Sequence, residues 1–526
     1  MHRTLPFLSF LLLFVNTPGR GQWSALDPTF GQNGYAHLDV NGQSYGFSGL
    51  VLPDDRIVVA GTFIINNEFW AAIARFMPDG SLDPTFGAGG VDSADVSGAM
   101  GYVVDMARQP DGKLVVLSSI SNTSYLVFRF LPDGGLDQGF GSNGSSVFPG
   151  GNGYDPVALA LQADGKVVVT GRYDYYSSSG ARLLLFRLNA DGSLDTGFGN
   201  MGAVQQDIGT LGKEAPSDLL VLPDGNVLVA GTVSYSSSGT QRYPHFFLRY
   251  APDGTLDNSF GNGGMVVDSL GTGQYLSMGD LIGLPSGGWL AGGSVSQNDS
   301  SRSVVARFLP GGMLDPAFAN GGMQVLEQPG RQYQGLSGIA QRADGSILFG
   351  GSAENEFGAN YVEFVGHLGA DGSIDTDYGG PTGMQVLDPA AFDNHLRLGF
   401  RTVMAQSTGK LVGITDIQYG GSIGRQLTVF RVEQLSTGVQ ERSAPARLSI
   451  HPNPVDGQLF VRSTMDASEL VLIDVHGRIV HVFRERTGLT AGSTVTLDWP
   501  EAVPVGTYLL RSCGAKGCAS ALVVKR

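Results

Sequence analysis

The chain has 526 residues, of which only 15% are charged, and its formal net charge at pH 7 is -15. Binding to nucleic-acid phosphates needs a basic face, so this composition argues against a nucleic-acid partner. Glycine accounts for 78 residues, about twice the usual share, which is typical of β structure with many turns.

The N-terminus has the pattern of a secretory signal. A short basic start, Met1 to Arg3, precedes the apolar residues 5–15 and the small and polar residues 17–21. The apolar run is too short for a transmembrane helix, so residues 1–21 are predicted to be a signal peptide. No cysteine lies near the expected cleavage point after Gly21, so no lipid anchor is expected. No transmembrane segment is expected either. The protein is predicted to pass through the periplasm and to be secreted or displayed on the cell surface.

One phrase occurs seven times in the following part of the chain: Leu-Asp or Ile-Asp, two variable residues, an aromatic and a small residue. We call it the repeat phrase. Its aspartates are separated by 56, 54, 58, 62, 58 and 60 residues, and they are Asp27, Asp83, Asp137, Asp195, Asp257, Asp315 and Asp375. A nearly constant period of this length indicates an array of similar supersecondary units.

Each unit predicts four short strands. An Asp-Gly turn between two apolar runs, as in residues 110–116, predicts a hairpin of the first two strands. A third strand is expected before the repeat phrase, for example at residues 71–76, and a fourth after it, for example at 90–96. Four strands in about sixty residues are typical of a propeller blade, and seven blades lie within the known range.

The two ends of the array predict its closure. The chain begins with a repeat phrase at Leu26 and a strand at residues 35–40, before any hairpin, and the last unit has a hairpin at 401–416 and a third strand at 427–434 but no fourth. The N-terminal strand is therefore expected to complete the last blade and leave no open edge. The predicted fold is all-β, a seven-bladed β-propeller over residues 22–434.

An arginine stands eight residues before the aspartate of the repeat phrase in most units. A guanidinium can hold a carboxylate through two parallel hydrogen bonds. The role is expected to be structural, because active sites break repeat symmetry and this pattern follows it. The expected pairs are Arg75 with Asp83, Arg129 with Asp137, Arg187 with Asp195, Arg249 with Asp257, Arg307 with Asp315 and, across the chain ends, Arg431 with Asp27; His367 stands eight before Asp375.

The aromatics of the repeat phrase are expected to be wedges between blades rather than ligand contacts. They are Phe30, Phe86, Phe140, Phe198, Phe260, Phe318 and Tyr378.

These motifs resemble a known repeat. The segment Asp-Gly-Ser-Leu-Asp-Pro-Thr-Phe-Gly at residues 79–87, with the Asp-Gly-Lys hairpin and the preceding arginine, resembles the delta-60 repeat of bacterial secreted proteins. The resemblance covers residues 26–434. The sixth copy departs from it at Gly311 and Ala319, and the seventh at Tyr378 and by an extra residue before Gly383. The resemblance implies a propeller-like domain and no established activity.

The composition changes after the array. Residues 435–446 are small and polar, as expected of a linker. Residues 447–526 have a strand periodicity of their own, with strands expected at 459–463, 469–474, 478–484, 494–499, 506–512 and 521–525, which indicates a small antiparallel β-sandwich.

This C-terminal unit resembles the type A sorting domain of the type IX secretion system. The motif residues are Pro452, Asn453 and Pro454, then Asp474, Gly477 and Arg478 at a hairpin, Gly506 and Tyr508 at a late strand, and the basic end at Lys525. The resemblance implies an outer-membrane export signal, the type IX machinery as a partner and a Bacteroidetes-type source. Cys513 and Cys518 flank a turn, and passage through an oxidising periplasm favours a disulfide between them.

Ligand binding is expected on the face whose loops differ from blade to blade. Tyrosines set among Ser, Asn and Gly are suited to stacking on sugar rings, although packing between blades is the alternative role. The candidate rim consists of Tyr45, Tyr102, Tyr154, Tyr173, Tyr175, Tyr235, Tyr275 and Tyr333.

Two function classes stay open. The first is a monomeric, secreted or cell-surface propeller that binds a glycan or protein ligand noncatalytically, with no cofactor and no metal site. The second is a polysaccharide hydrolase or lyase, which needs two carboxylates across the channel mouth. Glu214, Asp280 and Asp393 are the candidates for those carboxylates, since no catalytic motif of another kind occurs.

Overall fold

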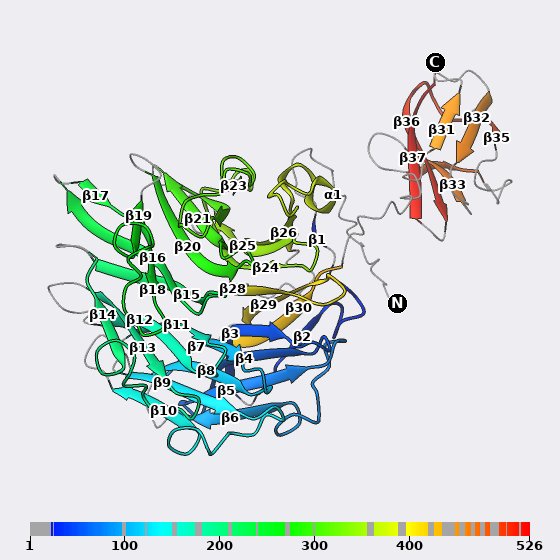
Figure 1. Cartoon of the computed structure of the whole chain (residues 1–526). Helices are drawn as coiled ribbons and strands as arrows, with labels where there is room; N and C mark the ends of the chain where they lie inside the picture. Colours follow the sequence, from blue (N-terminus) through cyan, green and yellow to red (C-terminus); the bar gives the residue numbers. More distant parts are fainter. Residues whose placement is uncertain are drawn as a thin grey trace. The chain divides into compact units, whose positions relative to one another are not determined.

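The structure is a computed structural model (Figure 1). It describes residues 23–525 apart from 25, 41, 97–100, 121–123, 150–154, 174–180, 209–212, 238–239, 269–273, 298–299, 355–361, 388–395, 419–424, 434–447, 452–457, 464–468, 474–478, 484–493, 501 and 515–516. The signal-peptide and linker predictions lie outside the described residues. The chain divides into two compact units, Met1–Leu435 and Ser436–Arg526, which are described separately.

The described residues confirm the all-β prediction. They contain one short helix, α1 (Thr376–Gly379), followed by a 3-10 turn (Gly380–Thr382), and otherwise only strands, turns and loops. Asp375 caps α1, because its side chain accepts hydrogen bonds from the backbone N–H groups of Asp377 and Tyr378.

The first unit contains seven sheets, and each of them is built on four antiparallel strands. Sheet I consists of β3 (Gln43–Val51), β4 (Ile57–Ile65), β5 (Glu68–Phe76) and β6 (Val91–Asp95). Sheet II consists of β7 (Val103–Arg108), β8 (Leu114–Ile120), β9 (Ser124–Phe130) and β10 (Ser145–Pro149). Sheet III consists of β11 (Asp155–Leu161), β12 (Val167–Tyr173), β13 (Arg182–Leu188) and β14 (Ala203–Gln206). Sheet IV consists of β15 (Lys213–Val221), β16 (Val227–Ser237), β18 (His245–Tyr250) and β19 (Met265–Asp268), with β17 (Thr240–Arg242) extending β16.

Sheets V to VII follow the same order. Sheet V consists of β20 (Gln274–Gly283), β21 (Trp289–Gln297), β22 (Ser300–Phe308) and β23 (Met323–Leu326). Sheet VI consists of β24 (Tyr333–Gln341), β25 (Ile347–Glu354), β26 (Val362–Leu368) and β27 (Met384–Leu387). Sheet VII consists of β28 (Leu396–Ala405), β29 (Leu411–Gln418), β30 (Arg425–Arg431) and the N-terminal β2 (Tyr35–His37). A further N-terminal strand, β1 (Trp23–Ser24), runs parallel to β27 on sheet VI. This pairing was not predicted from the sequence.

The first strand of each sheet is the innermost one. The innermost strands contact one another in chain order, β3 with β7, β7 with β11 and so on to β28, and β28 also contacts β3. In Figure 1 the yellow β28, β29 and β30 accordingly lie beside the blue β2 and β3. Six of the innermost strands have one β-bulge at the same place, and β28 has two. A bulge bends a strand and increases its twist, which suits strands crowded at a centre.

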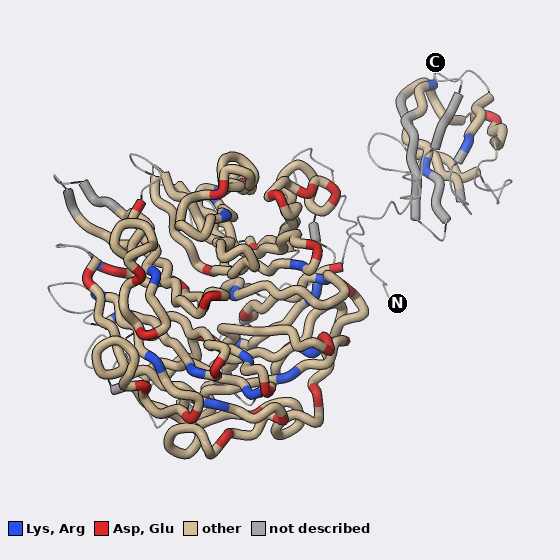
Figure 2. The backbone as a smooth tube through the Cα atoms, in the orientation of Figure 1, with Lys and Arg blue, Asp and Glu red and all other residues tan. Residues whose placement is uncertain are grey.

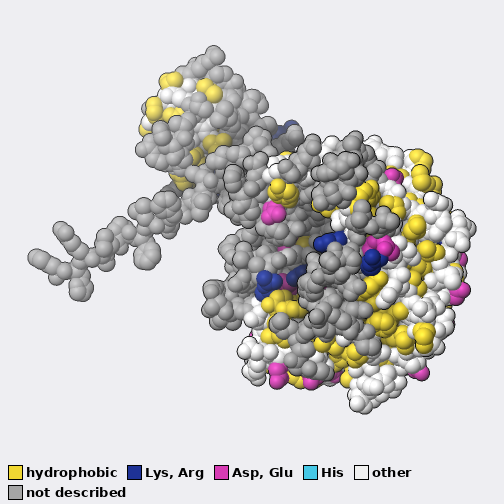
Figure 3. Space-filling model, turned by 90° about the vertical axis from the view of Figure 1, so that its left-hand side faces the viewer, with side chains coloured by type: hydrophobic (Ala, Val, Ile, Leu, Met, Phe, Trp, Pro, Cys, Tyr) yellow, Lys and Arg dark blue, Asp and Glu magenta, His cyan; other side chains and the backbone are white. Residues whose placement is uncertain are grey.

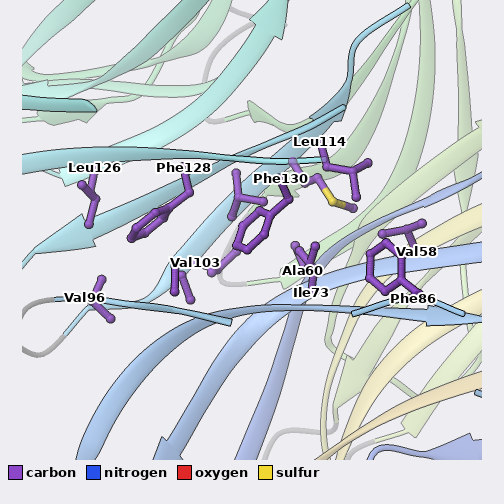
Figure 4. Close-up of a cluster of buried hydrophobic side chains, with 14 residues drawn as sticks. Val58, Ala60, Ile73, Phe86, Val96, Val103, Leu114, Leu126, Phe128 and Phe130 are labelled. Atoms are coloured by element: carbon purple, nitrogen blue, oxygen red, sulfur yellow. The ribbon is translucent and has the colours of Figure 1, made fainter. Parts of the chain in front are cut away.

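Hydrophobic side chains fill the wedges between neighbouring sheets. Figure 4 shows the cluster between sheets I and II, where the fully buried Phe86 of the repeat phrase lies beside Val58, and Leu114 and Phe130 come from sheet II. Phe30 occupies the corresponding place in a cluster that contains residues of sheets VII and I. The expected wedge position of these aromatics therefore agrees with their surroundings.

The second unit has two sheets around one core. One sheet has the order β31 (Leu448–His451), β32 (Gln458–Ser463), β35 (Thr494–Asp498), and the other β34 (Ile479–Val482), β33 (Glu469–Ile473), β36 (Gly506–Gly514), β37 (Gly517–Lys525). The strand β31 was missed by the sequence analysis. The core includes Leu459, Leu472, Trp499 and Val523.

Candidate functional site

The connections of each sheet divide between two faces. In sheet I the turn after β3 and the loop after β5 lie on one face, and the β4–β5 turn and the link to sheet II lie on the other, because successive antiparallel strands run in opposite directions. We call the first the regular face, since it carries the Asp-Gly turns and the repeat phrases. The second is the variable face.

On the regular face the repeated arginine joins two sheets. In sheet I the Arg75 Nε donates to Asp83 Oδ2 at 2.8 Å, while its NH1 donates to the carbonyl oxygen of Pro132 in sheet II at 2.8 Å. The same guanidinium lies 4.4 Å from the centroid of the Phe86 ring. One side chain thus binds its own loop, the loop of the next sheet and the aromatic wedge between them.

The structure brings together all six expected arginine and aspartate partners. The Nε to Oδ2 distances in the other five are 2.8 Å for Arg129 with Asp137, 2.7 Å for Arg187 with Asp195, 2.8 Å for Arg249 with Asp257, 2.8 Å for Arg307 with Asp315 and 2.9 Å for Arg431 with Asp27. Each of these arginines also donates to a carbonyl of the following sheet. Figure 2 accordingly shows basic and acidic positions spread over the sheets rather than gathered in one place.

A glycine of the next sheet completes the joint. Gly134 has a φ of +99°, and a Cβ there would lie 2.8 Å from the backbone nitrogen of Gly87 and 3.1 Å from the Phe86 ring. Only glycine fits this close approach with a left-handed backbone. This explains why a glycine stands three residues before the aspartate of six of the seven repeat phrases, preceded by an aspartate in five of them.

One joint is built differently. Between sheets VI and VII, His367 replaces the arginine and its Nδ1 lies 2.6 Å from Asp375 Oδ2. Arg342, on the turn after β24, reaches the Gly409 carbonyl of sheet VII with its Nε at 2.9 Å and lies 3.3 Å from His367 Nε2. The sequence could not indicate this replacement, because Arg342 stands outside the repeat phrase.

Two aspartates of these joints, Asp27 and Asp83, are ionised at neutral pH. Burial raises the pKa of Asp27, but hydrogen bonds from Lys410 and Thr29 and the charge of Arg431 outweigh it and hold the pKa well below the usual range. The same balance, with Thr85, Arg56 and Arg75, lowers the pKa of Asp83. A permanently charged, fully bonded carboxylate is a structural element rather than an acid or base for catalysis.

On the variable face, four aromatic rings of sheets I and II form a group that we call the aromatic cluster: Tyr45, Phe47, Phe69 and Tyr102. The Tyr102 ring centroid lies 6.3 Å from that of Tyr45, 6.1 Å from Phe47 and 5.4 Å from Phe69, all edge to face. Tyr102 is 39% exposed, whereas Tyr45 and Phe47 are half-buried. The cluster therefore presents one accessible ring on a packed base.

Two arginines of sheet VII border the aromatic cluster. The Arg401 guanidinium lies 5.0 Å from the Phe47 ring centroid, and that of Arg425 lies 5.4 Å from the Tyr45 centroid. Arg401 NH2 also binds Asp416 Oδ2 at 2.5 Å, and Asp416 is fully buried. The sequence analysis missed both arginines, because more than 350 residues separate them from Tyr45 and no local pattern connects them.

The other rim tyrosines do not join this cluster. Tyr275 packs edge to face on Tyr243, with ring centroids 4.9 Å apart, and Tyr333 is 40% exposed beside a hollow of about 240 Å³ lined by Ser301, Gln334 and Glu354. Tyr173 is half-buried in β12, Tyr235 lies exposed on β16, and Tyr154 and Tyr175 lie outside the described residues. The described tyrosines thus occupy separate places on the face instead of one rim.

The repeated sheets match a known family model. Five segments match a family model described as "Domain of unknown function (DUF5122) beta-propeller", at residues 52–86, 109–140, 162–198, 222–260 and 284–318. Each segment begins near the end of an innermost strand and ends at the aromatic of a repeat phrase. The chain is a β-propeller repeat protein. No curated protein matches it.

Solved structures resemble the propeller only distantly. The polysaccharide lyase Uly1 has a TM-score of 0.44 and 11% identity over 74% of this chain and 90% of that one. The β-propeller domain of the Trilobed protease from Pyrococcus furiosus has a TM-score of 0.41 and 8% identity, covering 76% of this chain and 97% of that domain. The acylaminoacyl peptidase of Pyrococcus horikoshii has a TM-score of 0.39 and 8% identity, covering 80% and 57%. At these scores the likeness carries no argument about ligand or activity.

Three aspartates occupy equivalent positions on innermost strands of the propeller. Asp105, Asp218 and Asp280 each follow a β-bulge, and each accepts a hydrogen bond from a backbone N–H of the next sheet, at 3.0 Å from Leu159, 2.8 Å from Leu281 and 2.8 Å from Ile339. All three precede the glycine of the following turn by seven residues. Of the three, only Asp280 was singled out from the sequence; this offset would have found the others.

Of the proposed catalytic carboxylates, Glu214 and Asp280 are described, and the charges that act on the two differ. Burial raises the pKa of Asp280 to about 7, and the charge of Asp105 adds to the effect. Burial also raises the pKa of Glu214, but the charges that act on it come from Asp207 and Arg182. Asp393 lies outside the described residues. Within the described part of the chain, no group of three or more His, Cys, Asp or Glu side chains could hold a metal ion, and no helix is long and apolar enough to span a membrane.

The raised pKa of Asp280 predicts a pH effect on the stability of the propeller. Its carboxyl binds its proton more tightly in the folded than in the unfolded state, so stability falls as the pH rises from about 4 to about 7. Asp280→Asn should remove this loss and stabilise the protein at about pH 8 relative to about pH 5, by about 3 kcal/mol. Urea unfolding at both pH values measures the effect, with Asp111→Asn on an exposed turn as control. An equal change at both pH values would contradict the assignment.

In the second unit, three of the sorting-motif residues are described. Tyr508 donates its hydroxyl to the Pro504 carbonyl at 2.8 Å, Lys525 Nζ donates to the Val503 carbonyl at 2.7 Å, and Gly506 begins β36. Pro452 to Pro454, Asp474, Gly477 and Arg478 lie outside the described residues. The backbone register places Cys513 opposite Cys518 in the β36–β37 hairpin. The disulfide stays a prediction.

Proposed function

We propose that this chain is a secreted or cell-surface protein whose seven sheets form a closed propeller and which binds a glycan or protein ligand, without catalysis, on its variable face. The aromatic cluster is the observation that carries the binding role. An accessible tyrosine on a base of packed rings is a rigid stacking surface that loses little entropy when a ligand binds.

Closure of the ring is supported by the joint between sheets VII and I. Arg431 NH1 donates to the Pro78 carbonyl at 2.6 Å, and the backbone N–H of Gly31 donates to the Asp79 carbonyl at 2.6 Å. Arg75 and Gly87 make the same two contacts with sheet II. The joint that would close the propeller therefore has the chemistry of an internal joint.

A noncatalytic role is favoured by the state of Tyr45. Its hydroxyl donates to Gln43 Oε1 at 2.7 Å, and burial raises its pKa while Arg425 opposes the rise. A phenol that holds its proton this firmly is a poor general base. It is suited to supporting Tyr102 instead.

Substitution of Tyr102 tests the proposal. In a screen of labelled glycans against the full chain, Tyr102→Ala should weaken binding of any retained ligand by about 1 to 3 kcal/mol, the contribution expected of an anchoring aromatic side chain. Tyr333→Ala, which removes a tyrosine of nearly equal exposure elsewhere on the face, is the matched control. Equal binding by the wild type and Tyr102→Ala would place the ligand elsewhere.

A polysaccharide hydrolase or lyase is the second candidate, favoured by one observation. A carboxyl group with a pKa of about 7, as at Asp280, is suited to general acid catalysis at neutral pH. Product analysis of the same glycan samples distinguishes the two functions. Shortened or unsaturated products that disappear in Asp280→Asn would favour the enzyme.

We also propose that the second unit is a sorting domain for the type IX secretion system. The two units have separate hydrophobic cores, so a chain that ends at residue 446 should fold its propeller and accumulate in the periplasm. Fractionation of cells that express the full and shortened chains measures the distribution. Delivery of the shortened chain to the surface at the normal level would refute the sorting role.

A further inference from the structure

We propose that the aromatic cluster with Arg425 is a subsite for an acidic sugar, in which a ring of the glycan stacks on Tyr102 and its carboxylate or sulfate binds the Arg425 guanidinium. This inference rests on the proposed binding function and names the class of its ligand.

The two arginines beside the cluster differ in what they already bind. Arg401 is neutralised by Asp416, to which its Nε and NH2 donate at 3.1 and 2.5 Å. Arg425 stands at the start of β30 and lies against the face of Tyr45. Its charge also acts on Asp416, but within the described residues no carboxylate lies within ion-pair distance of it. A guanidinium held against a ring, with no ion pair among the described residues, has donors available for an anion.

Three neighbouring sheets supply the parts of this subsite. Arg425 comes from sheet VII, Tyr45 from the start of β3 in sheet I, and Tyr102 from the residue before β7 in sheet II. An aromatic ring matches the apolar C–H face of a pyranose, and an acidic group projects from the edge of that ring. Stacking surface and cation therefore lie side by side as an acidic sugar needs them.

Because the rest of the molecule is acidic, Arg425 attracts an acidic ligand selectively to this subsite. The chain has 33 basic and 48 acidic residues, so most of its surface repels polyanions. The strand β17 lies at the left of Figure 1, and Figure 3 shows the variable face from that side. The Lys and Arg side chains visible on this face lie near the middle of the face, and most of the visible Asp and Glu side chains lie toward its edge. Among the described residues, an acidic group is thus attracted toward the middle of the face. A single guanidinium such as that of Arg425 is too little for the phosphates of a nucleic acid, whose affinity comes from many ion pairs.

The test compares polymers that differ in charge. Binding of the full chain is measured to polygalacturonate and its uncharged methyl ester, and to sulfated carrageenan and uncharged agarose. At least one acidic polymer should bind about tenfold or more tightly than its uncharged counterpart, as expected for hydrogen bonds to a charged group. That preference should fall with added salt.

Arg425→Gln should abolish the preference and leave the thermal stability unchanged. Arg302→Gln is the matched control, since Arg302 is also partly exposed on this face but is paired with Glu327 at 3.1 Å; it should keep the preference. Equal binding of acidic and uncharged forms, or a preference retained by Arg425→Gln, would overturn the inference. Binding of an uncharged glycan that is lost in Tyr102→Ala but not in Arg425→Gln would overturn the acidic ligand and leave the binding function standing. Failure of the wild type to bind any glycan or protein would overturn both.

Discussion

A chain that lacks residues 23–40 should aggregate or unfold at a markedly lower temperature than the full protein. The deletion removes β2, whose residues Tyr35, Ala36 and His37 pair with Phe430, Val429 and Thr428, and leaves β30 as an unpaired edge. It also removes the buried side chains of Leu26, Phe30, Tyr35 and Leu38. Burial of each such side chain contributes about 2 kcal/mol, a sum comparable to the whole stability of a typical domain.

The same deletion leaves a buried cation without its partner. Arg431 Nε donates to Asp27 Oδ2 at 2.9 Å, and Lys410 Nζ lies 2.5 Å from the same oxygen. Loss of Asp27 adds two uncompensated positive charges to the exposed edge. Thermal unfolding and size-exclusion chromatography measure the effect, with a chain that begins at Trp23 as the control. A shortened propeller that stays monomeric with an unchanged Tm would show that the array is open.

The second large effect is expected for Arg187→Ala. The side chain donates to Asp195 Oδ2 at 2.7 Å and to the carbonyl of Pro252 in the next sheet, and it lies 4.5 Å from the Phe198 ring centroid. Removing it should cost about 3 kcal/mol, because the buried arginine is lost and a partly buried carboxylate loses its main partner. Lys166, at 2.9 Å from Asp195, limits the loss.

Two further variants make the measurement specific. Arg187→Lys keeps the charge but cannot reach the carboxylate, the carbonyl and the ring together, so an intermediate loss is expected. Arg302→Ala removes a surface ion pair and should cost under about 1 kcal/mol. Chemical unfolding ranks the three. If Arg187→Ala were no more harmful than Arg302→Ala, the joint would not be the stabilising contact between the sheets.

Contacts within a repeat were accessible to sequence analysis, and contacts between repeats were not. The spacing of eight residues from Arg75 to Asp83 leads from the third strand through one turn and back, so a constant offset implies a constant pair. The second bond of Arg75, to Pro132, crosses 57 residues, and no local pattern marks it. The same holds for the candidate site, where Tyr45 and Tyr102 were found by type and Arg425 was missed because only the fold brings it near.

The rim of tyrosines was predicted from loop position, and the structure separates it into several places. The partner of each ring comes from a different element: Tyr102 packs on Tyr45 of the neighbouring innermost strand, whereas Tyr275 packs on Tyr243, which follows the β17 extension of sheet IV. The composition of the loops indicates that aromatic rings will be present on the variable face. It does not indicate which rings meet, because that depends on the conformation of loops that share no repeat.

The N-terminal segment has a consequence for the order in which the first unit folds during synthesis. Its first strand, β1, pairs with β27, and its second, β2, pairs with β30. The residues made first thus find their partners among the last to be made, with Tyr35 opposite Phe430. Sheets I to V can form as they emerge, but sheets VI and VII stay incomplete until nearly the whole first unit is available. Contacts of such long range form slowly, so the native structure of the first unit is complete only after the last of its strands has been made.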